Sequence, residues 1–185
     1  ENGYCELTAF PCENVEWTEE EKEDIALLLE VLYLHVTRSR LIRKTREYSY
    51  CNLITMLPNS AGFVRIIQQH FQDQTICQYN GFYFNLKSFG LLSYKYGGAE
   101  GDLMIKRYAV AVRKWLAEDE TLAHLGGDNF MALVKKSRTA EFLHLLEKGE
   151  VTAKYMGRVV PVYIAAAAGA YEITAKDRDP RNIMN

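Results

Sequence analysis

The feature that most constrains the fold of this chain is a polar break between two short apolar runs. The break covers residues 126–129 (GGDN), and the runs cover residues 122–125 and 130–134. Glycine adopts the positive φ angles that tight turns require, and Asp and Asn also favour turns. The pattern therefore predicts a β-hairpin, and with it an antiparallel sheet.

The other patterns along the chain alternate between helix and strand. Apolar residues recur at helical spacing in residues 62–71 and again from Met104 to Trp115, and residues 139–147 also favour a helix. The aromatic run at 82–84 favours a strand, and residues 159–168 are interpreted as one buried strand. We expect an α+β domain in which helices cover an antiparallel sheet.

The N-terminal part of the chain carries the signals of one long helix. Thr18 followed by Glu21 is the capping-box pattern, and the acidic residues around Glu21 favour a helix N-terminus. Apolar residues then recur at spacings of three and four, and basic residues load the far end, which predicts a helix from about Thr18 to about Arg46. Its apolar face is wider than a surface stripe. We expect this face to pack against a partner helix; the alternative is that it folds back on its own domain.

Composition restricts the classes of partner. With 185 residues, 48% of them hydrophobic, the chain can bury one substantial core and still carry an appended segment. Its 22 basic residues are matched by 24 acidic ones, which gives a net charge of −2. A chain without a basic surplus lacks the charge that holds a phosphate backbone, so we expect no nucleic-acid partner.

Cysteine usage and hydropathy indicate the compartment. The four cysteines, Cys5, Cys12, Cys51 and Cys77, form no CxxC pair and have no histidines at metal-ligand spacing. No apolar run approaches the roughly 20 residues that span a bilayer, and the acidic start does not resemble a signal peptide. We expect reduced thiols and a cytoplasmic location, either for the whole protein or for the soluble part of a longer one.

Four stretches together resemble a known domain. Residues 124–130 (HLGGDNF) resemble the GGDEF signature of bacterial diguanylate cyclases, which join two GTP molecules into cyclic di-GMP. In the order of that family, residues 52–60 (NLITMLPNS) look like its DxLTGLPNR segment, and residues 85–89 (NLKSF) occupy the place of its DxDxFK strand end. Residues 96–102 (YGGAEGD) look like its YGHxxGD turn. The likeness covers about residues 50 to 175 and implies the palm-like antiparallel sheet of nucleotide cyclases.

The resemblance also implies a metal site that has changed. Family members hold Mg²⁺ with carboxylates, because this ion prefers hard oxygen ligands and neutralises the triphosphate charge. The corresponding positions here are Asn85, Asp128 and Asn129, of which Asp128 and Asn129 also stand at the catalytic positions of the signature. An amide offers an oxygen without charge. We therefore expect Mg²⁺ binding through Asn85 and Asp128 to be weak or absent.

Nucleotide-binding positions are partly retained. Ser93 stands where the family has an asparagine that reads the guanine edge, while its aspartate partner remains as Asp102. Gly126 and Gly127 still allow a phosphate to approach the backbone closely. Two structural roles stay open: Asp128 as a turn cap and Asp102 as a helix N-cap.

The product-inhibition site of the family has also changed. Many members carry an RxxD motif before the signature strand, and the equivalent residues here are 117–120 (AEDE). Neither the arginine nor the aspartate is in place. We therefore expect no tight inhibitory binding of cyclic di-GMP at this motif.

These inferences lead to one principal functional hypothesis and two alternatives. We expect residues 1–16 to be the tail of a sensor-like segment, residues 17–49 an amphipathic signalling helix, and residues 50–185 a C-terminally incomplete, degenerate GGDEF domain. It would relay signals in cyclic di-GMP signalling without cyclase activity, as a homodimer through the helix, between an attached sensor and an effector such as an EAL-like domain. The alternatives are a diverged cyclase that still uses GTP, and a dimerisation scaffold that binds no nucleotide.

Overall fold

The computed structural model describes residues 6–12, 16–177, 179 and 183. The chain divides into two compact units, Glu1–Glu47 and Tyr48–Asn185, each of which is described by itself. The expected sensor tail at residues 1–16 lies partly outside the described residues, and Cys5 lies outside them. Cys12, Cys51 and Cys77 are free thiols.

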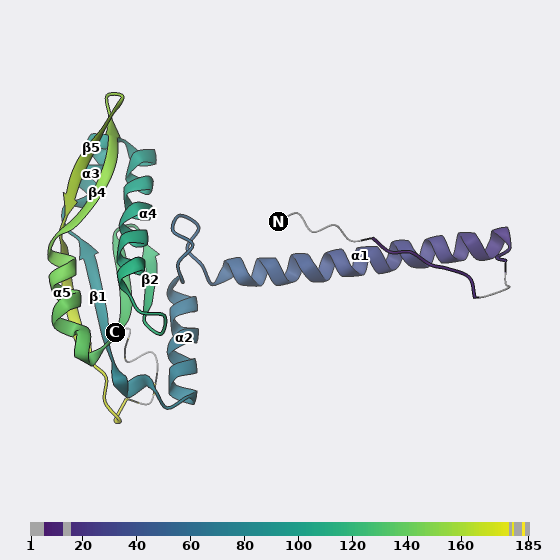
Figure 1. The fold of residues 1–185 in the computed structure, drawn as a ribbon, viewed down its shortest axis with the longest axis horizontal. Coiled ribbons are helices and arrows are strands. Elements are labelled where there is room, and N and C mark those ends of the chain that lie inside the picture. Colours follow the sequence, from purple (N-terminus) through teal and green to yellow (C-terminus); the bar gives the residue numbers. More distant parts are fainter. Residues whose placement is uncertain (1–5, 13–15, 178, 180–182, 184–185) are drawn as a thin grey trace. The chain divides into compact units, whose positions relative to one another are not determined.

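The N-terminal unit consists mainly of the long helix that the sequence predicts, α1 (Glu19–Ser49) (Figure 1). Its first turn is a capping box: the Glu21 N–H donates to Thr18 Oγ1 at 3.2 Å, and the Thr18 N–H donates to Glu21 Oε2 at 2.8 Å. The hydrogen bonds that the Thr18 N–H and the Thr18 hydroxyl donate to the Glu21 carboxylate lower the pKa of that carboxyl group. No residue of α1 is buried along its length. Among the helices in the described parts of the chain, none has the length and apolar composition of a membrane span.

The C-terminal unit is built on a four-stranded antiparallel sheet with the strand order β2-β3-β1-β6. Its strands are β1 (Tyr79–Leu86), β2 (Thr121–Gly126), β3 (Asn129–Lys135) and β6 (Ala166–Glu172). β1 is central, because it pairs with β3 on one side and with β6 on the other. The predicted hairpin is β2–β3, and the α+β class with a helix-covered antiparallel sheet and a long N-terminal helix is confirmed.

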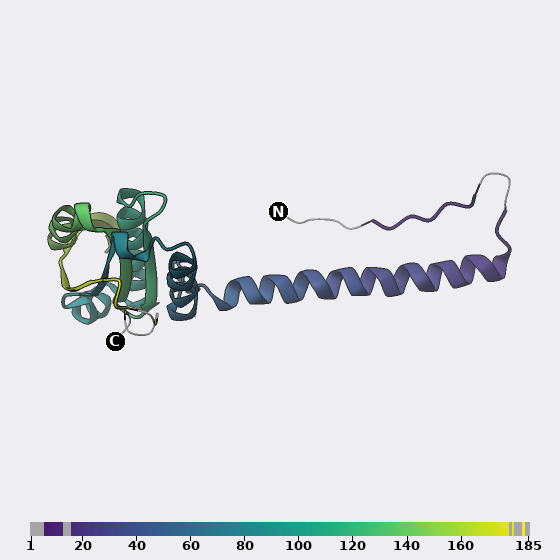
Figure 2. The same cartoon turned by 90° about the horizontal axis from the view of Figure 1, so that it is seen from below.

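Helices cover both faces of this sheet (Figures 1 and 2). One face packs Phe82, Phe84 and Phe130 against α4 (Gly98–Trp115) and α5 (Thr139–Glu147). The opposite face packs Met131 and Leu133 against α2 (Ser60–Gln72). Because side chains alternate along a strand, residues 82, 84 and 86 of β1 face α4, while residues 83 and 85 face the side on which α2 lies.

The start of α2 is fixed by Asn59, which lies directly before the helix. Asn59 caps the helix, because its Oδ1 accepts a hydrogen bond from the Gly62 N–H at 3.0 Å. The Asn59 Nδ2 donates to the carbonyl oxygens of Ser49 and Cys51 at 2.8 and 3.2 Å. One side chain thus joins residues 49–51 to the start of α2.

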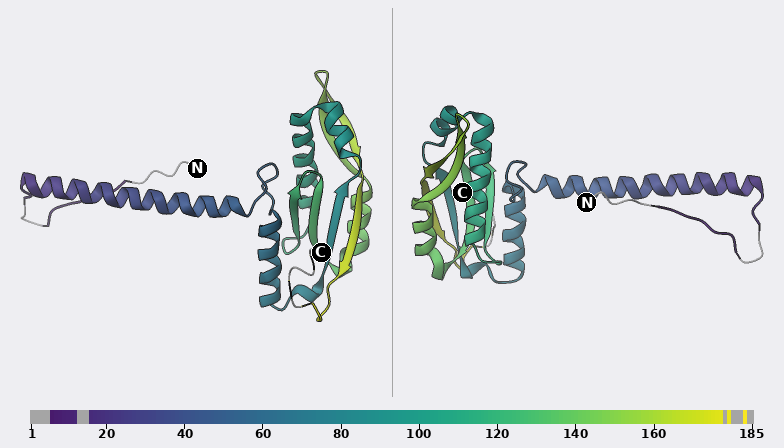
Figure 3. Two further views of the ribbon diagram at one scale, coloured as in Figure 1. Left: turned by 180° about the vertical axis from the view of Figure 1, so that it is seen from behind. Right: turned by 45° about the horizontal axis from the view of Figure 1, so that its top comes forward.

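The prediction of one buried strand at residues 159–168 is wrong. The chain instead forms β5 (Arg158–Ile164), a break at Ala165, and then β6. β5 pairs with a strand that the sequence analysis missed, β4 (Gly149–Tyr155), in a separate two-stranded sheet (Figure 3). The turn between them is Met156-Gly157, both at positive φ, which is hairpin chemistry that the apolar composition of the next residues obscured.

Three short elements complete this unit. They are α3 (Phe89–Tyr96), which the sequence analysis did not predict, and the 3₁₀ turns η1 (Ile76–Gln78) and η2 (Lys136–Arg138). The β4–β5 hairpin is attached to α4 through Glu100, whose Oε1 accepts from the Lys154 N–H at 2.8 Å and from Arg107 Nη1 at 2.7 Å. These bonds, with the charge of Arg107, lower the pKa of the Glu100 carboxyl.

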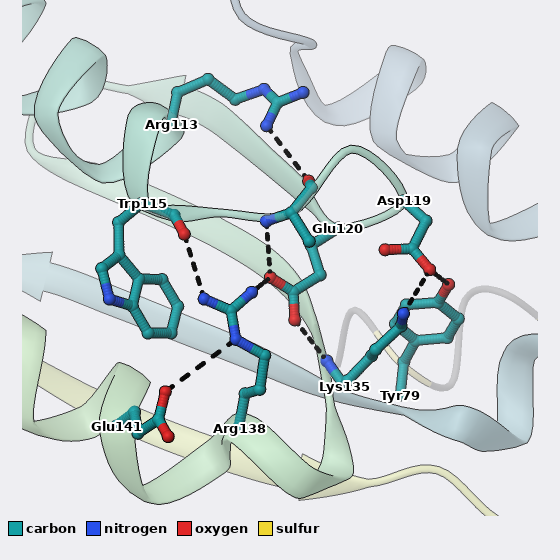
Figure 4. Close-up of polar contacts among 9 residues, drawn as sticks. Tyr79, Arg113, Trp115, Asp119, Glu120, Lys135, Arg138 and Glu141 are labelled. Atoms are coloured by element: carbon teal, nitrogen blue, oxygen red, sulfur yellow. Dashed lines mark hydrogen bonds and ion pairs between the residues drawn. The ribbon is translucent and has the colours of Figure 1, made fainter.

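A buried carboxylate fixes the start of β2 (Figure 4). Glu120 is almost fully buried, and it accepts hydrogen bonds from the Ala117 N–H at 2.9 Å and from the Lys135 N–H at 3.0 Å. Its charge is paired with Arg138, whose guanidinium lies 4.0 Å from the centre of the Trp115 ring and donates to the Trp115 carbonyl. Glu120, the last residue of the AEDE stretch, therefore has its partners inside the domain.

We predict that Glu120→Ala lowers the free energy of unfolding by about 3 kcal/mol, because removing one partner leaves a poorly solvated Arg138 and two backbone donors without their acceptor. The matched control is Glu172→Ala, which removes an exposed ion pair with Lys136 at 3.2 Å and is expected to cost less than about 1 kcal/mol. Urea unfolding of both variants measures the difference. Equal losses would contradict a structural role for the Glu120 pair.

Candidate functional site

The hairpin tip between β2 and β3 has a backbone that requires glycine. Gly126 has a φ of +133° and Gly127 a φ of +57°. The first angle is strained for any residue with a side chain, and the second is tolerated mainly by glycine and asparagine. The register shifts between His124 and Gly126, so the tip contains a bulge before Gly126 pairs with Asn129. Both glycines therefore have a conformational reason to be here.

The end of β1 lies directly beside this tip. Asn85 is the antiparallel partner of Asn129, and its Nδ2 donates to Asn129 Oδ1 at 3.1 Å. The Leu86 N–H donates to the Asp128 carbonyl at 3.0 Å. The structure thus brings together Asn85, Asp128 and Asn129, the three positions that the sequence analysis assigned to a metal.

Asn129 uses all of its side-chain hydrogen-bonding capacity within the protein. Its Oδ1 accepts from Asn85 and also from the Tyr83 hydroxyl, which lies at 2.6 Å. Its Nδ2 donates to the Gly126 carbonyl at 3.3 Å and to Asp128 Oδ1 at 3.2 Å. An amide oxygen has two lone pairs and an amide nitrogen two hydrogens, so the group is fully satisfied.

Carboxylates are sparse around this cluster. Asp128 is half-buried, and one of its oxygens already accepts from Asn129. Within residues 6–12, 16–177, 179 and 183, no group of three or more His, Cys, Asp or Glu side chains is arranged to hold a metal. A divalent ion at the tip would rely on one carboxylate and on amide oxygens.

The two predicted base-reading residues lie on adjacent helices. Ser93 is in α3 and packs against Gly101 of α4, where an added Cβ would lie 2.5 Å from Ser93 Oγ. Asp102 follows on α4 and is exposed. The suggested role of Asp102 as a helix N-cap is wrong, because α4 begins at Gly98, so Asp102 lies within the helix.

His124 connects the hairpin tip to the segment before α2. It is fully buried and stacks on Phe130, with ring centroids 4.5 Å apart and planes 12° from parallel. Its Nε2 lies 2.9 Å from the Gly127 carbonyl oxygen, and its Nδ1 lies 3.2 Å from Thr55 Oγ1. The His124 N–H also donates to the Pro58 carbonyl at 2.9 Å. The hairpin tip is therefore tied to residues 55–58, which precede α2.

Burial lowers the pKa of His124, while its contact with the Gly127 carbonyl and the charge of Asp102 act in the opposite direction. The neutral imidazole is thus the form that the fold favours. The influence of Asp102 also indicates that the start of α4 lies within electrostatic range of the hairpin. His124 is therefore a packed side chain.

The model of the family described as diguanylate cyclase, GGDEF domain, matches residues 50–185. This chain belongs to the GGDEF family. The match covers the whole four-stranded sheet, the hairpin tip and the helices that cover them.

Relatives agree with this assignment. The diguanylate cyclase DgcP of Escherichia coli K12 is 22% identical over 198 residues, an alignment that covers 98% of this chain and 57% of that protein. This chain thus spans little more than half the length of that relative. Among solved structures, the coiled coil and GGDEF domain of DgcB from Caulobacter crescentus, in complex with c-di-GMP, has a TM-score of 0.65 at 14% identity and covers 87% of each chain. A sensory box/GGDEF family protein from the same species has a TM-score of 0.60 at 15% identity, covering 73% of this chain and 90% of its own. At these identities the likeness shows the fold.

Two residues of the site were not singled out from the sequence. Tyr83 lies two positions before Asn85 and therefore on the same face of β1, a spacing that could have indicated it. His124 stands in the HLGGDNF stretch, where no role was assigned to it. Its partners Thr55 and Pro58 lie more than 60 positions away in sequence, so spacing alone gave no signal.

We predict that the domain loses stability as the pH falls from 7.5 to 5.5. A buried histidine with a lowered pKa binds a proton more readily in the unfolded chain, where the histidine pKa is about 6.5. Its contribution to the free energy of unfolding is therefore complete above about pH 6.5 and is lost as the pH falls below that value. Each such histidine can account for at most about 1.4 kcal/mol over the pH unit below 6.5. His70, whose pKa is also lowered by burial, contributes with the same sign.

Urea unfolding of the native chain and of His124→Gln at both pH values measures this effect. The variant is expected to keep the dependence that comes from His70 and to lose that of His124. An unchanged pH dependence in His124→Gln would contradict the assignment.

Proposed function

We propose that this chain is a degenerate GGDEF module that relays a signal in cyclic di-GMP signalling without synthesising the dinucleotide. The observation that carries the proposal is the saturated side chain of Asn129. Its Oδ1, at the position of a family carboxylate, already accepts from Tyr83 at 2.6 Å and from Asn85 at 3.1 Å. Placing a cation on this oxygen would break at least one of these bonds.

The donor set at the tip does not suit Mg²⁺. This ion requires near-octahedral oxygen ligands and gives up its water reluctantly, so carboxylate charge is needed to hold it. Asp128 supplies one charge and shares one oxygen with Asn129. Two facing carboxylates would repel each other unless a cation lay between them, whereas Asn85 and Asn129 satisfy each other directly. This tip is held together by neutral hydrogen bonds in place of a metal.

Residual nucleotide binding would depend on the backbone. Gly127 is exposed, and the position of a Cβ on Gly126 has no other atom within 4 Å, so a phosphate can approach the tip. Backbone amides keep their capacity to bind phosphate when side-chain carboxylates are lost. Ser93 and Asp102 would supply what remains of guanine recognition, in weaker form than an asparagine and aspartate pair.

The attached partners follow from the family. We expect an input domain before α1 and an effector, for which an EAL-like domain is one candidate, and we assign residues 1–16, 17–49 and 50–185 to a sensor tail, a signalling helix and the degenerate domain. A diverged cyclase remains the rival hypothesis, because Asp128 and the glycine pair persist. A scaffold that binds no nucleotide is the third hypothesis, and it is favoured by the fully satisfied Asn129.

We predict that the protein incubated with GTP and Mg²⁺ makes no cyclic di-GMP above background, because phosphoryl transfer depends on metal-assisted charge stabilisation. The double variant Asn85→Asp/Asn129→Glu is expected to gain Mg²⁺-dependent GTP binding. Tyr83→Phe, which frees one lone pair on Asn129 without adding charge, is the matched control and should gain none. Chromatography of the reaction and calorimetry of binding measure the two effects. Product formation by the native chain would favour the diverged cyclase.

A second prediction concerns the glycines: GTP binds weakly, about equally with Mg²⁺ and with chelator, and Gly127→Val reduces the affinity by about tenfold or more. A branched residue at a φ of +57° also strains the backbone. Gly157→Val is the matched control, because Gly157 has a φ of +76° at the β4–β5 turn and lies outside the candidate site. Calorimetry with all three proteins measures this. Tight binding that disappears with chelator would mean that Asp128 still builds a metal site.

The exposed face of α1 leads to a third prediction, that the chain is a homodimer through this helix. Leu28 and Leu32, one turn apart, are 61% and 53% exposed, and an unpartnered apolar stripe is typical of an association surface. A chain lacking residues 1–46 is expected to sediment as a monomer. Leu28→Glu/Leu32→Glu should do the same while keeping the helix. Equal masses for the native and truncated chains would exclude this interface.

A further inference from the structure

His124 holds the carbonyl group of the hairpin tip in one orientation. A carbonyl oxygen can only accept hydrogen bonds, so the 2.9 Å contact with Gly127 requires that His124 Nε2 carry the hydrogen. In the neutral imidazole Nδ1 is then an acceptor, and the Thr55 hydroxyl donates to it at 3.2 Å. Both ring nitrogens are engaged, and stacking on Phe130 fixes the plane of the ring.

The orientation of that carbonyl also determines where the next N–H points. In a trans peptide the C=O and N–H groups lie in one plane and point in opposite directions. With the Gly127 carbonyl turned inward to His124, the Asp128 N–H is directed away from the imidazole. The following peptide is fixed as well, because the Asp128 carbonyl accepts from the Leu86 N–H at 3.0 Å.

The direction in which the Asp128 N–H points follows from the two faces of the sheet. His124 and Phe130 pack on the face that α4 and α5 cover. Asn85 and Asn129 lie on the opposite face, at the open end of β1 and β3. The Asp128 N–H is therefore directed toward the side of the tip on which the cluster of Asn85 and Asn129 lies.

We propose that His124 is a positioning residue for phosphate binding at the hairpin tip, where it orients the Gly127–Asp128 peptide so that the Asp128 N–H faces the phosphate oxygens of a bound nucleotide. This inference rests on the nucleotide binding proposed above and names the residue that prepares the site for it. The imidazole itself does not contact the ligand. Because His124 is also bonded to Thr55, the segment before α2 supports the same peptide.

Substitutions at His124 separate this role from packing. His124→Gln keeps an N–H at about the reach of Nε2 and can still donate to Gly127. His124→Asn is polar but too short for that bond, and His124→Phe keeps the stacking on Phe130 while losing both hydrogen bonds. Leu122→Ala, a core residue of the same strand, is the control for destabilisation without a change at the tip.

The test is calorimetric titration of GTP and of tripolyphosphate into each protein with chelator present. We expect His124→Phe and His124→Asn to bind both probes about tenfold more weakly than the native chain, as for the loss of one hydrogen-bond donor. His124→Gln and Leu122→Ala are expected to stay within about threefold of it. Tripolyphosphate has no base, so a parallel loss for both probes assigns the effect to phosphate.

Three results would overturn the inference. Native affinity in both His124→Phe and His124→Asn would show that the tip amide needs no such support. An equal loss in Leu122→Ala, or a failure of His124→Gln to restore binding, would reduce His124 to a packing residue. If the native chain binds neither probe, the proposed nucleotide binding itself is wrong. This outcome differs from the first one, in which the native chain binds and the His124 variants bind equally well.

Discussion

The antiparallel pairing of β1 with β3 is the constraint on which the rest of the domain depends. Its register sets Asn85 opposite Asn129 and Phe84 opposite Phe130, which places one pair at the open end and the other in the core. Side chains alternate between the faces of a strand, so a slip of one residue would bury Tyr83 and expose Phe84. The burial of Phe82, Phe84 and Leu86 against α4 and α5 therefore also fixes the geometry of the candidate site.

The facing side chains that hold the tip together are the amides of Asn85 and Asn129. A pair of facing carboxylates repel each other until a cation joins them, so their geometry depends on a ligand. Asn129 instead makes four hydrogen bonds within this chain: it accepts from Tyr83 and Asn85 on β1, and it donates to Gly126 and Asp128. The order of the side chains at the tip thus comes from hydrogen bonds within the folded chain.

Buried polar side chains hold both ends of β2. Glu120 at its start binds Arg138 and two backbone donors, and His124 near its end binds Gly127 and Thr55. A buried polar group without hydrogen-bond partners lowers the free energy of unfolding. Glu120 and His124 therefore each need a complete set of partners. Those partners come from Ala117, the hairpin tip, β3, η2 and residues 50–59. The hairpin therefore joins segments that are distant in sequence.

The sequence alone determined the elements whose signals are local. The capping box at Thr18 and Glu21, the helices around Phe63 and Phe142, and the glycine hairpin each follow from neighbouring residues, and the four stretches that resemble the family identified the positions of Asn85, Asp128 and Asn129. Local signals failed at residues 149–164, where the valines from Val159 onward concealed a second hairpin, because the Met156-Gly157 turn is short and the strands are largely exposed. Only the tertiary structure decided that Tyr83 and Asn85 saturate Asn129 and that His124 joins Thr55 to Gly127, since such bonds depend on how strands and loops meet in space and leave no trace in the spacing of residues along the chain.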